Sequence, residues 1–296
     1  MVATTDAGAS PGKITISVTK PKAPGTGFAK RCAVGGPPLA TTCTGSSKGI
    51  AIDAAGTIYV TNEKQLHRYT ADEDCKLAPA GEPIELPPDN PRPQVVGKGP
   101  IYMRSGGVAW GLTRAGDAIY AHDFLVGMFR VDRGKVEPAC TQEFGFHGFV
   151  KIGKRLLAQR KGIEEITLGK AGACKAKSAR IDDKARALFA VGDRTYTKFD
   201  DLGVRLCHVA AMAACGDGAC ILDHNCPQVV QLAADGTVLR TIEGDQLFDV
   251  RPWSIDGLAT ATDGSVYVYA RHRDKVDGKE VCEAAVYRIP PAVFAR

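Results

Sequence analysis

Short apolar runs separated by polar turns recur along the chain, and two of them are closely alike. Residues 49–60 read Gly-Ile-Ala-Ile-Asp-Ala-Ala-Gly-Thr-Ile-Tyr-Val, and residues 257–268 read Gly-Leu-Ala-Thr-Ala-Thr-Asp-Gly-Ser-Val-Tyr-Val. Each segment has an apolar run, a polar turn that ends in glycine, and a second run that contains an aromatic residue. This pattern predicts a β-hairpin. Its recurrence predicts a fold built from repeats.

The turn glycine gives the repeats a common reference point. The glycines that align are Gly56, Gly116, Gly153, Gly192, Gly218 and Gly264. Their spacings are 60, 37, 39, 26 and 46 residues, on average about the length of one four-stranded propeller blade. We therefore predict an all-β fold, a six-bladed β-propeller. Five blades are the alternative, because the hairpin at residues 187–197 leaves little room for two outer strands.

The same pattern predicts one domain. We expect a flexible tether at residues 1–12 and a single β-propeller domain at residues 13–296. A proline-rich loop insertion at residues 81–100 accounts for the long first interval. Only three strands fit in the last blade, so we expect an N-terminal strand at residues 13–18 to complete it and close the ring.

Composition and charge narrow the class of protein. The chain has 296 residues, 44% of them apolar, which is sufficient for a packed core. Its net charge of +5 comes from basic and acidic residues that are interleaved. Without a concentrated basic face we expect no nucleic-acid partner. No apolar run reaches 18 residues, so we expect no transmembrane segment.

Ten cysteines, with no Cys-x-x-Cys pair among them, favour disulfides over a zinc site. We therefore expect a secreted, periplasmic or cell-surface lipoprotein, whose signal or anchor is absent from this sequence. Cys215 and Cys220 bracket a tight hairpin and are expected to pair, and Cys32 could close a short loop with Cys43. Cysteines that follow third strands are expected to connect a blade to its neighbour or to an insertion; they are Cys75, Cys140 and Cys174.

The first hairpin also resembles a known repeat. Asp53-x-x-Gly56-x-Ile58-Tyr59-Val60-x-Asn62, followed by Leu66-His67-Arg68-Tyr69, resembles an NHL repeat. The chain from about residue 46 to residue 290 is similar to six-bladed NHL, SMP-30/gluconolactonase and strictosidine-synthase-like propellers. That resemblance implies a fold first, and an activity of calcium- or zinc-assisted lactone or phosphoester hydrolysis. The Glu-Gly-Pro-x-Trp segment of the SMP-30-like enzymes does not occur here.

Propellers usually bind ligands on one face, around the central channel. The loops that follow the second strands, and those that lead into the innermost strands, carry polar residues that we expect on this face. The predicted ligand-binding residues are Asn62, Glu63, Arg104, His147, Gln159, Arg160 and Arg271. Together with Arg273 and with Trp110 or Trp253, the arginines could bind a carboxylate, a phosphate or an aromatic group.

Histidines and carboxylates on the same face could hold a divalent metal such as Ca, Zn or Cu. The candidate ligands are His122, Asp123, Asp223, His224 and His272. His122 or His224 would then be the catalytic base. Hydrogen-bonded rim residues are the alternative for all of them, and soft-metal binding around His224 and Cys226 is an alternative for the nearby cysteines.

Two functions follow from these residues. The first is a monomeric, secreted or surface-tethered propeller that binds a small-molecule or protein ligand on its loop-rich face. The second is a metal-assisted hydrolase, lactonase- or esterase-like, or a lyase that uses the histidines and acidic residues of that face. The sequence leaves open whether the protein is an enzyme.

Overall fold

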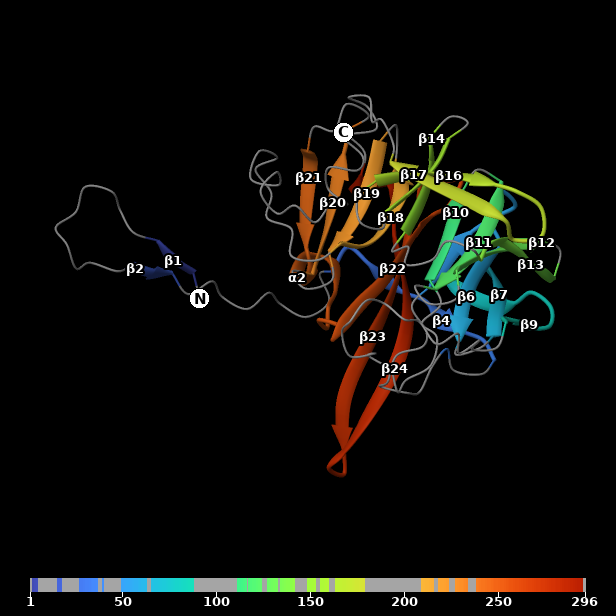
Figure 1. Ribbon diagram of the computed structural model, residues 1–296. Coiled ribbons are helices and arrows are strands. Elements are labelled where there is room, and N and C mark those ends of the chain that lie inside the picture. The colour runs from blue at the N-terminus through green and yellow to red at the C-terminus, as the bar shows by residue number, and fades with distance from the viewer. Residues whose placement is uncertain are drawn as a thin grey trace.

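The computed structural model describes most of the strands of this chain (Figure 1). The described residues are 2–4, 15–17, 27–36, 39, 49–62, 65–87, 111–115, 117–123, 127–132, 134–141, 148–152, 155–159, 163–178, 209–215, 218–223, 227–233 and 238–294. Within them the fold is all-β, with one α-helical turn, α2 (Gly244–Leu247), and one 3-10 turn, Pro291–Val293. The hairpin predicted at residues 187–197 lies outside the described residues.

Four antiparallel sheets have four strands each and are arranged like propeller blades. The first contains β10 (Gly111–Ala115), β11 (Ala118–Asp123), β12 (Gly127–Asp132) and β13 (Lys135–Cys140). The second contains β14 (Gly148–Ile152), β15 (Arg155–Gln159), β16 (Ile163–Leu168) and β17 (Cys174–Ser178). The third contains β18 (Val209–Cys215), β19 (Gly218–Asp223), β20 (Gln228–Leu232) and β21 (Val238–Glu243). The fourth contains β22 (Ser254–Thr260), β23 (Val266–Val276), β24 (Lys279–Ile289) and β3 (Lys30–Arg31).

A further sheet of six strands contains the same four-strand meander. Its strands are β4 (Ala33–Val34), β5 (Ile50–Ile52), β6 (Ile58–Asn62), β7 (Gln65–Ala71), β8 (Lys76–Pro79) and β9 (Ile84–Glu85). β9 pairs with β7, so part of the predicted loop at residues 81–100 is a strand. Residues 88–100 lie outside the described residues.

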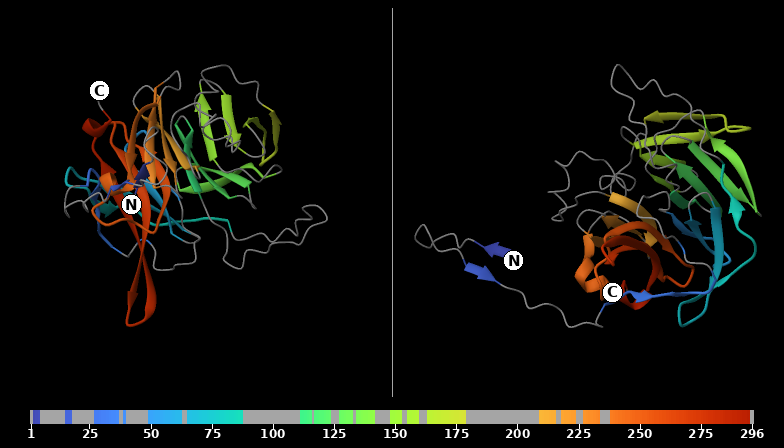
Figure 2. Two further views of the ribbon diagram at one scale, coloured as in Figure 1. Left: turned by 90° about the vertical axis from the view of Figure 1, so that its left-hand side faces the viewer. Right: turned by 90° about the horizontal axis from the view of Figure 1, so that it is seen from below.

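The innermost strands of the five sheets contact one another in cyclic order. β5 contacts β10, β10 contacts β14, β14 contacts β18, β18 contacts β22, and β22 returns to β5. This order of neighbours defines a propeller-like ring, which is visible from below in Figure 2. The predicted six blades are not confirmed, since the described residues contain five such meanders.

Local turn chemistry forms the two hairpins that introduced the repeat. Asp53 Oδ1 accepts the N–H groups of Ala55 and Thr57 at 2.9 Å, and Gly56 has φ +85°. Asp263 Oδ1 accepts the N–H of Ser265 at 2.8 Å, and the following Gly264 has φ +82°. Glycine adopts this left-handed conformation without a steric cost. The predicted hairpins, β5–β6 and β22–β23, are therefore confirmed.

An N-terminal strand completes the last blade, but it is not the predicted one. β3 pairs with β24, setting Arg31 opposite Tyr287 and Lys30 opposite Arg288. Residues 15–17 instead form β2, which pairs with β1 (Val2–Thr4). The prediction for residues 13–18 was wrong because apolar alternation marks a strand without naming its partner. A two-residue strand such as β3 carries no such pattern.

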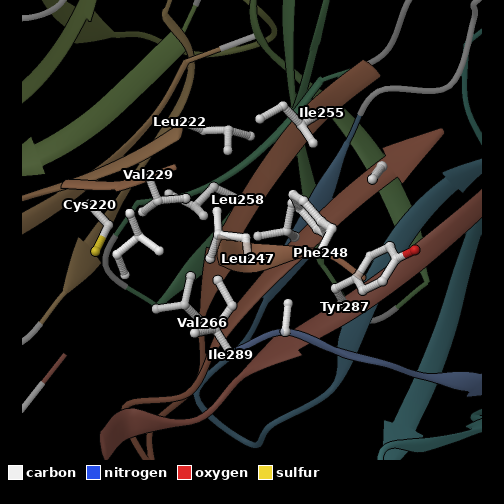
Figure 3. Packing of buried hydrophobic residues seen from close by; sticks show 14 of the residues in the cluster. Cys220, Leu222, Val229, Leu247, Phe248, Ile255, Leu258, Val266, Tyr287 and Ile289 are labelled. Atoms are coloured by element: carbon white, nitrogen blue, oxygen red, sulfur yellow. The ribbon is translucent and has the colours of Figure 1, made fainter. Parts of the chain in front are cut away.

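The core lies between neighbouring sheets. Leu222 and Val229 of one sheet pack with Leu258, Val266 and other apolar residues of the next (Figure 3). All residues of β22 except the last are buried. β5 is also buried along its whole length, and a strand covered on both faces tends to be continuously apolar, which explains why β5 lacks alternation.

Three disulfides connect described cysteines. Cys215–Cys220 bridges the β18–β19 hairpin as predicted. Cys140–Cys174 connects β13 to β17 and therefore joins two neighbouring sheets, as expected for cysteines after third strands. Cys32 pairs with Cys75 rather than with the predicted Cys43. Sequence proximity favoured the short loop, whereas the pairing of β4 with β8 brings Cys32 next to Cys75.

One hairpin is longer than the others and projects from the body of the protein (Figures 1 and 2). β23 and β24 have eleven residues each and pair along their whole length. Their turn, Asp277-Gly278, has φ +51° and +76°, and Asp-Gly is a preferred sequence for such turns. We call residues 272–283 the arm. Among the described residues, no helix is long and apolar enough to cross a membrane.

Candidate functional site

The polar residues predicted from the turn alignment occupy equivalent places in the sheets. Four lie on the second strand, opposite the first residue of the innermost strand: His122, Gln159, Asp223 and Arg271. In the six-stranded sheet, Thr61 lies beside Gly49, the residue just before β5, since the Thr61 N–H donates to the Gly49 carbonyl at 3.1 Å, and Asn62 follows it. The turn alignment thus predicted the position of these residues along their strands to within one residue.

The beginnings of neighbouring innermost strands are packed closely at this level. A Cβ atom added to Gly49 would lie 2.6 Å from the backbone nitrogen of Leu112 in the next sheet. Thr61 is fully buried there, and its hydroxyl oxygen accepts the Gly49 N–H at 2.9 Å. At this point the ring is therefore filled by backbone and small side chains.

His122 lies on β11 and is buried. Its ring packs on Gly111, where an added Cβ would lie 2.5 Å from the ring carbon Cε1. Its Nε2 atom lies 3.3 Å from the Thr113 hydroxyl. These contacts hold the ring against β10, so His122 is a hydrogen-bonded residue of the sheet.

Asp223 ends β19 and is fully buried. One of its carboxylate oxygens accepts a hydrogen bond of 3.3 Å from the Gln228 amide, on the adjacent strand β20. A buried carboxylate needs such donors, because burial without them is costly. Asp223 therefore has a structural partner within its own sheet.

Arg271 belongs to a buried polar cluster at the base of the arm. Its Nε donates to Asp256 Oδ2 at 2.8 Å, and Nη2 lies 3.4 Å from the Ser254 hydroxyl. Ser254 in turn donates to Asp256 Oδ1 at 2.7 Å. Only 6% of the Arg271 side chain and 3% of the Asp256 side chain are exposed. The two charges are thus removed from water as a hydrogen-bonded pair.

Trp253 covers this cluster and is itself 48% exposed. The guanidinium carbons of Arg271 and Arg273 each lie 5.1 Å from the centre of its ring. Cations at this distance are attracted to an aromatic face. We call Trp253, Arg271 and Arg273 the Trp–Arg platform. It combines an exposed aromatic ring, a buried cation and the partly exposed cation of Arg273, which forms an ion pair with Glu280.

His272 is adjacent to Arg271 but has different surroundings, because successive side chains of a strand point to opposite faces. Its Nε2 lies 2.6 Å from the Tyr287 hydroxyl, and both residues are buried. Burial lowers the pKa of His272 below its ordinary value, and the nearby Arg31 lowers it further, against smaller opposite effects of Glu283 and Asp274. His272 is therefore part of the packing at the arm's base.

The predicted metal ligands are not grouped in the part of the chain that the structure describes. No set of three or more His, Cys, Asp and Glu side chains there could hold a metal ion. His122 and His272 lie within hydrogen-bond distance of hydroxyl groups, and Asp223 accepts a hydrogen bond from the Gln228 amide, so a metal role for these three residues stays a prediction. His224 lies outside the described residues, and only the strand position of Asp123 is described, so their role stays a prediction.

Several predicted ligand-binding residues also lie outside the described residues: Glu63, Arg104, His147 and Arg160. For Gln159 only the strand position is described. Asn62 is half-buried at the end of β6. Of the predicted set, the structure therefore characterises the surroundings of Arg271 best.

Ser254 and Asp256 belong to the buried cluster around Arg271 but were not among the predicted site residues. The alignment searched the ends of strands and their loops, whereas Asp256 lies inside β22. The sequence does carry one signal for Asp256. A charged residue within an apolar strand is rarely buried unless it has a partner, so Asp256 predicts a nearby cation. Its partner, Arg271, was on the predicted list.

Comparisons with known proteins find only distant similarities to solved structures. No protein-family model and no curated protein matches the chain, so the NHL-repeat resemblance is not confirmed. Glutaminyl cyclase from Myxococcus xanthus matches 86% of this chain and 100% of its own at 11% identity and a TM-score of 0.44. A candidate gluconolactonase matches 82% and 74% at 11% identity and 0.41. A streptogramin B lyase matches 83% and 66% at 13% identity and 0.33, so the chain spans just under two thirds of that lyase.

The class of this protein therefore rests on its own topology. Repeated antiparallel meanders, with innermost strands that contact one another in a ring, define a β-propeller-like protein. Many unrelated functions occur on this architecture, so the fold does not supply an activity.

Proposed function

We propose that this chain is a secreted or surface-tethered binding protein whose Trp–Arg platform holds an anionic group of a ligand or protein partner. The observation that carries the proposal is the exposed ring of Trp253 beside two guanidinium groups. Tryptophan and arginine are the residues on which binding energy concentrates at interfaces. An exposed tryptophan that is held in place offers contact area at little entropic cost.

The buried cluster supports this function by keeping the platform rigid. Arg271 is held by Asp256 and Ser254, and the Trp253 backbone N–H donates to the Arg271 carbonyl at 2.8 Å. Arg251 and Lys275 are exposed nearby in sequence and add positive charge. A positioned aromatic ring among cations suits a carboxylate or phosphate that is attached to an apolar group.

Disulfides support the proposed location. Three disulfides among the described residues are more than cytosolic proteins usually hold, since the cytosol keeps thiols reduced. We also infer five blades, the alternative of the sequence analysis, because the contact between β14 and β18 makes their sheets neighbours.

Fluorescence titration tests the proposed function, because Trp253 is half-exposed and its emission responds to a bound group. Citrate, glucuronate, inorganic phosphate and a glutamate-rich peptide would be added to the full chain. We expect at least one anion to change the emission saturably, and Trp253→Phe to remove that signal. Arg273→Gln should weaken binding about tenfold, the effect of one charge-assisted contact.

Arg130→Gln is the matched control, because Arg130 is exposed on β12 and pairs only with Asp132 among the described acidic residues. It should bind like the wild-type chain. If none of the four probes gives a signal that depends on Trp253, the proposed function is wrong.

A further inference from the structure

Among the described strands, the β23 edge of the arm has no partner beyond the Trp–Arg platform. β22 pairs with β23 as far as Ser254 and Arg271, and Trp253 adds one backbone hydrogen bond to Arg271. β23 continues for five more residues to Val276, and among the described strands only β24 pairs with that extension. Figure 1 shows the two strands leaving the body together. One side of residues 272–276 is therefore free of the described strands.

The register identifies which backbone groups face this open side. In a β-strand, the N–H and C=O of one residue point to the same side, and those of the next residue point to the other. The Arg271 carbonyl points toward Trp253. By alternation, the N–H and C=O of Arg273 and Lys275 lie on the same open edge, whereas His272, Asp274 and Val276 face β24. The arm thus offers two donors and two acceptors in strand geometry.

The β23 side chains on one face of this edge are basic, and Glu280 of β24, opposite Lys275, forms an ion pair with Arg273 there. Arg271, Arg273 and Lys275 alternate along β23 and therefore share one face of the arm with Trp253. An added strand places its own side chains directly opposite theirs. Acidic residues at every second position would match Arg273 and Lys275.

Charge also argues against a second copy of this chain on the same edge. Two β23 edges paired antiparallel would set Arg273 and Lys275 of one copy against the same residues of the other. Like charges directly opposite each other are destabilising. Edge lysines are a common means by which proteins prevent such self-association.

From this geometry we infer that the open edge of β23 binds an extended, acidic segment of a partner protein as a third strand of the arm. The inference rests on the proposed function and names its partner class. Backbone hydrogen bonds to Arg273 and Lys275 supply affinity, and alternating carboxylates supply specificity.

Synthetic peptides test the inference. The probe is a blocked hexapeptide, Thr-Glu-Thr-Glu-Thr-Val, titrated against the full chain by calorimetry and by the emission of Trp253. We expect binding of the glutamate peptide, and at least tenfold weaker binding of the same peptide with lysine at both glutamates. Amide exchange at Arg273 and Lys275 should slow at least tenfold in the complex, as it does when a strand edge becomes paired.

N-methylation separates strand pairing from simple charge attraction. Methyl groups on the two glutamate nitrogens remove the donors that face β23 and should weaken binding at least tenfold. Methyl groups on two threonine nitrogens point away from the edge and should change binding less than threefold. On the protein, Lys275→Pro removes the charge and the open-edge N–H, whereas Lys275→Gln removes only the charge. We expect the proline variant to bind about fivefold more weakly than the glutamine variant, the effect of one backbone hydrogen bond.

Each of these results supports or overturns the binding of an acidic strand to the β23 edge. Equal loss from both methylation patterns, or equal affinity of the glutamate and lysine peptides, would overturn strand addition to a basic edge. A dimer in sedimentation velocity that Lys275→Pro dissociates would assign the edge to a second copy and overturn the acidic partner. Should Lys275→Pro not fold, the methylated peptides still decide. Anions that bind the platform while no peptide does would overturn this inference and leave the proposed function intact.

Discussion

Asp256 and Arg271 depend on each other at the scale of single residues. Each is almost fully buried, so the attraction between them and their hydrogen bonds with Ser254 must offset the loss of hydration. Such a pair adds little net stability, yet the loss of one partner leaves the other charge buried alone. The cluster therefore fixes the position of Trp253 more than it strengthens the fold.

We predict that Arg271→Met lowers the free energy of unfolding by roughly 3–5 kcal/mol, because the buried Asp256 carboxylate loses the guanidinium that offsets its charge. Arg271→Met combined with Asp256→Leu should recover a large part of this loss. Urea denaturation of the two variants measures both effects. The Asp256→Leu variant alone completes the comparison. If the losses of the two single variants add up to the loss of the double variant, the pairing of Arg271 with Asp256 is contradicted.

The lowered pKa of His272 predicts how the free energy of unfolding changes with pH. Its pKa is lowered by burial and by Arg31, so the unfolded chain takes up a proton near its ordinary pKa of 6.5 while the folded protein does not. The free energy of unfolding should therefore fall as the pH drops below about 6.5. Above that pH the group makes no further contribution.

His272→Gln tests this sign, since glutamine is uncharged and can still bond to the Tyr287 hydroxyl. Thermal unfolding at pH 7.5 and pH 5.0 should show a smaller acid-induced loss for the variant than for the wild type. His67, whose pKa is also lowered by burial, is retained in the variant and accounts for part of the remaining loss. An unchanged loss in His272→Gln would contradict the assignment.

At the scale of elements, the disulfides differ in what they connect. Cys215–Cys220 closes a hairpin with a separation of 5 residues, whereas Cys32–Cys75 joins the N-terminal segment to the six-stranded sheet with a separation of 43. A crosslink restricts the unfolded chain more when it closes a longer loop. The longer bridge should therefore contribute more stability.

Replacing both cysteines of a bridge by alanine tests this order. We expect a loss on the order of 4 kcal/mol for the Cys32–Cys75 pair and about 2 kcal/mol for the Cys215–Cys220 pair, from loop-closure entropy. Guanidinium denaturation without reductant measures both. An equal or inverted order would show that native contacts of the sulfur atoms, rather than loop length, dominate.

Local chemistry decided which elements could be predicted from the sequence. Asp53 and Gly56 lie within one turn, so their hairpin and its register were predictable. The Cys215–Cys220 bridge was predictable for the same reason. β3 has two residues and its partner lies at the other end of the chain, so no pattern could identify it. The Asp256–Arg271 pair also depends on two strands meeting in a bulged register.

At the scale of the whole molecule, β3 closes the ring. Its residues pair with β24, and Lys30 forms an ion pair with Asp74 of the six-stranded sheet. Removal of residues 1–31 would leave the outer edge of β24 unpaired and delete the backbone bonds of Phe28 and Ala29 to Gln246 and Leu247. Unpaired edges invite association with other chains.

We predict that the chain without residues 1–31 melts at a lower temperature, by on the order of 5 °C or more, and associates on size exclusion. The chain without residues 1–12 is the control: it loses β1, which among the described strands pairs only with β2, and it should melt like the full chain. Equal melting temperatures for all three would mean that β3 does not hold the ring closed.

The place of β3 also sets an order of events during synthesis. Lys30 is synthesised long before Arg288, the residue opposite it. Until then the early segment has no strand beside it and could pair wrongly. Oxidation of Cys32 with Cys75 needs only the chain up to Cys75, and it would hold this segment beside the first sheet while the other sheets are still being synthesised. The Cys32–Cys75 bridge would thus keep β3 available until β24 has been synthesised and can pair with it.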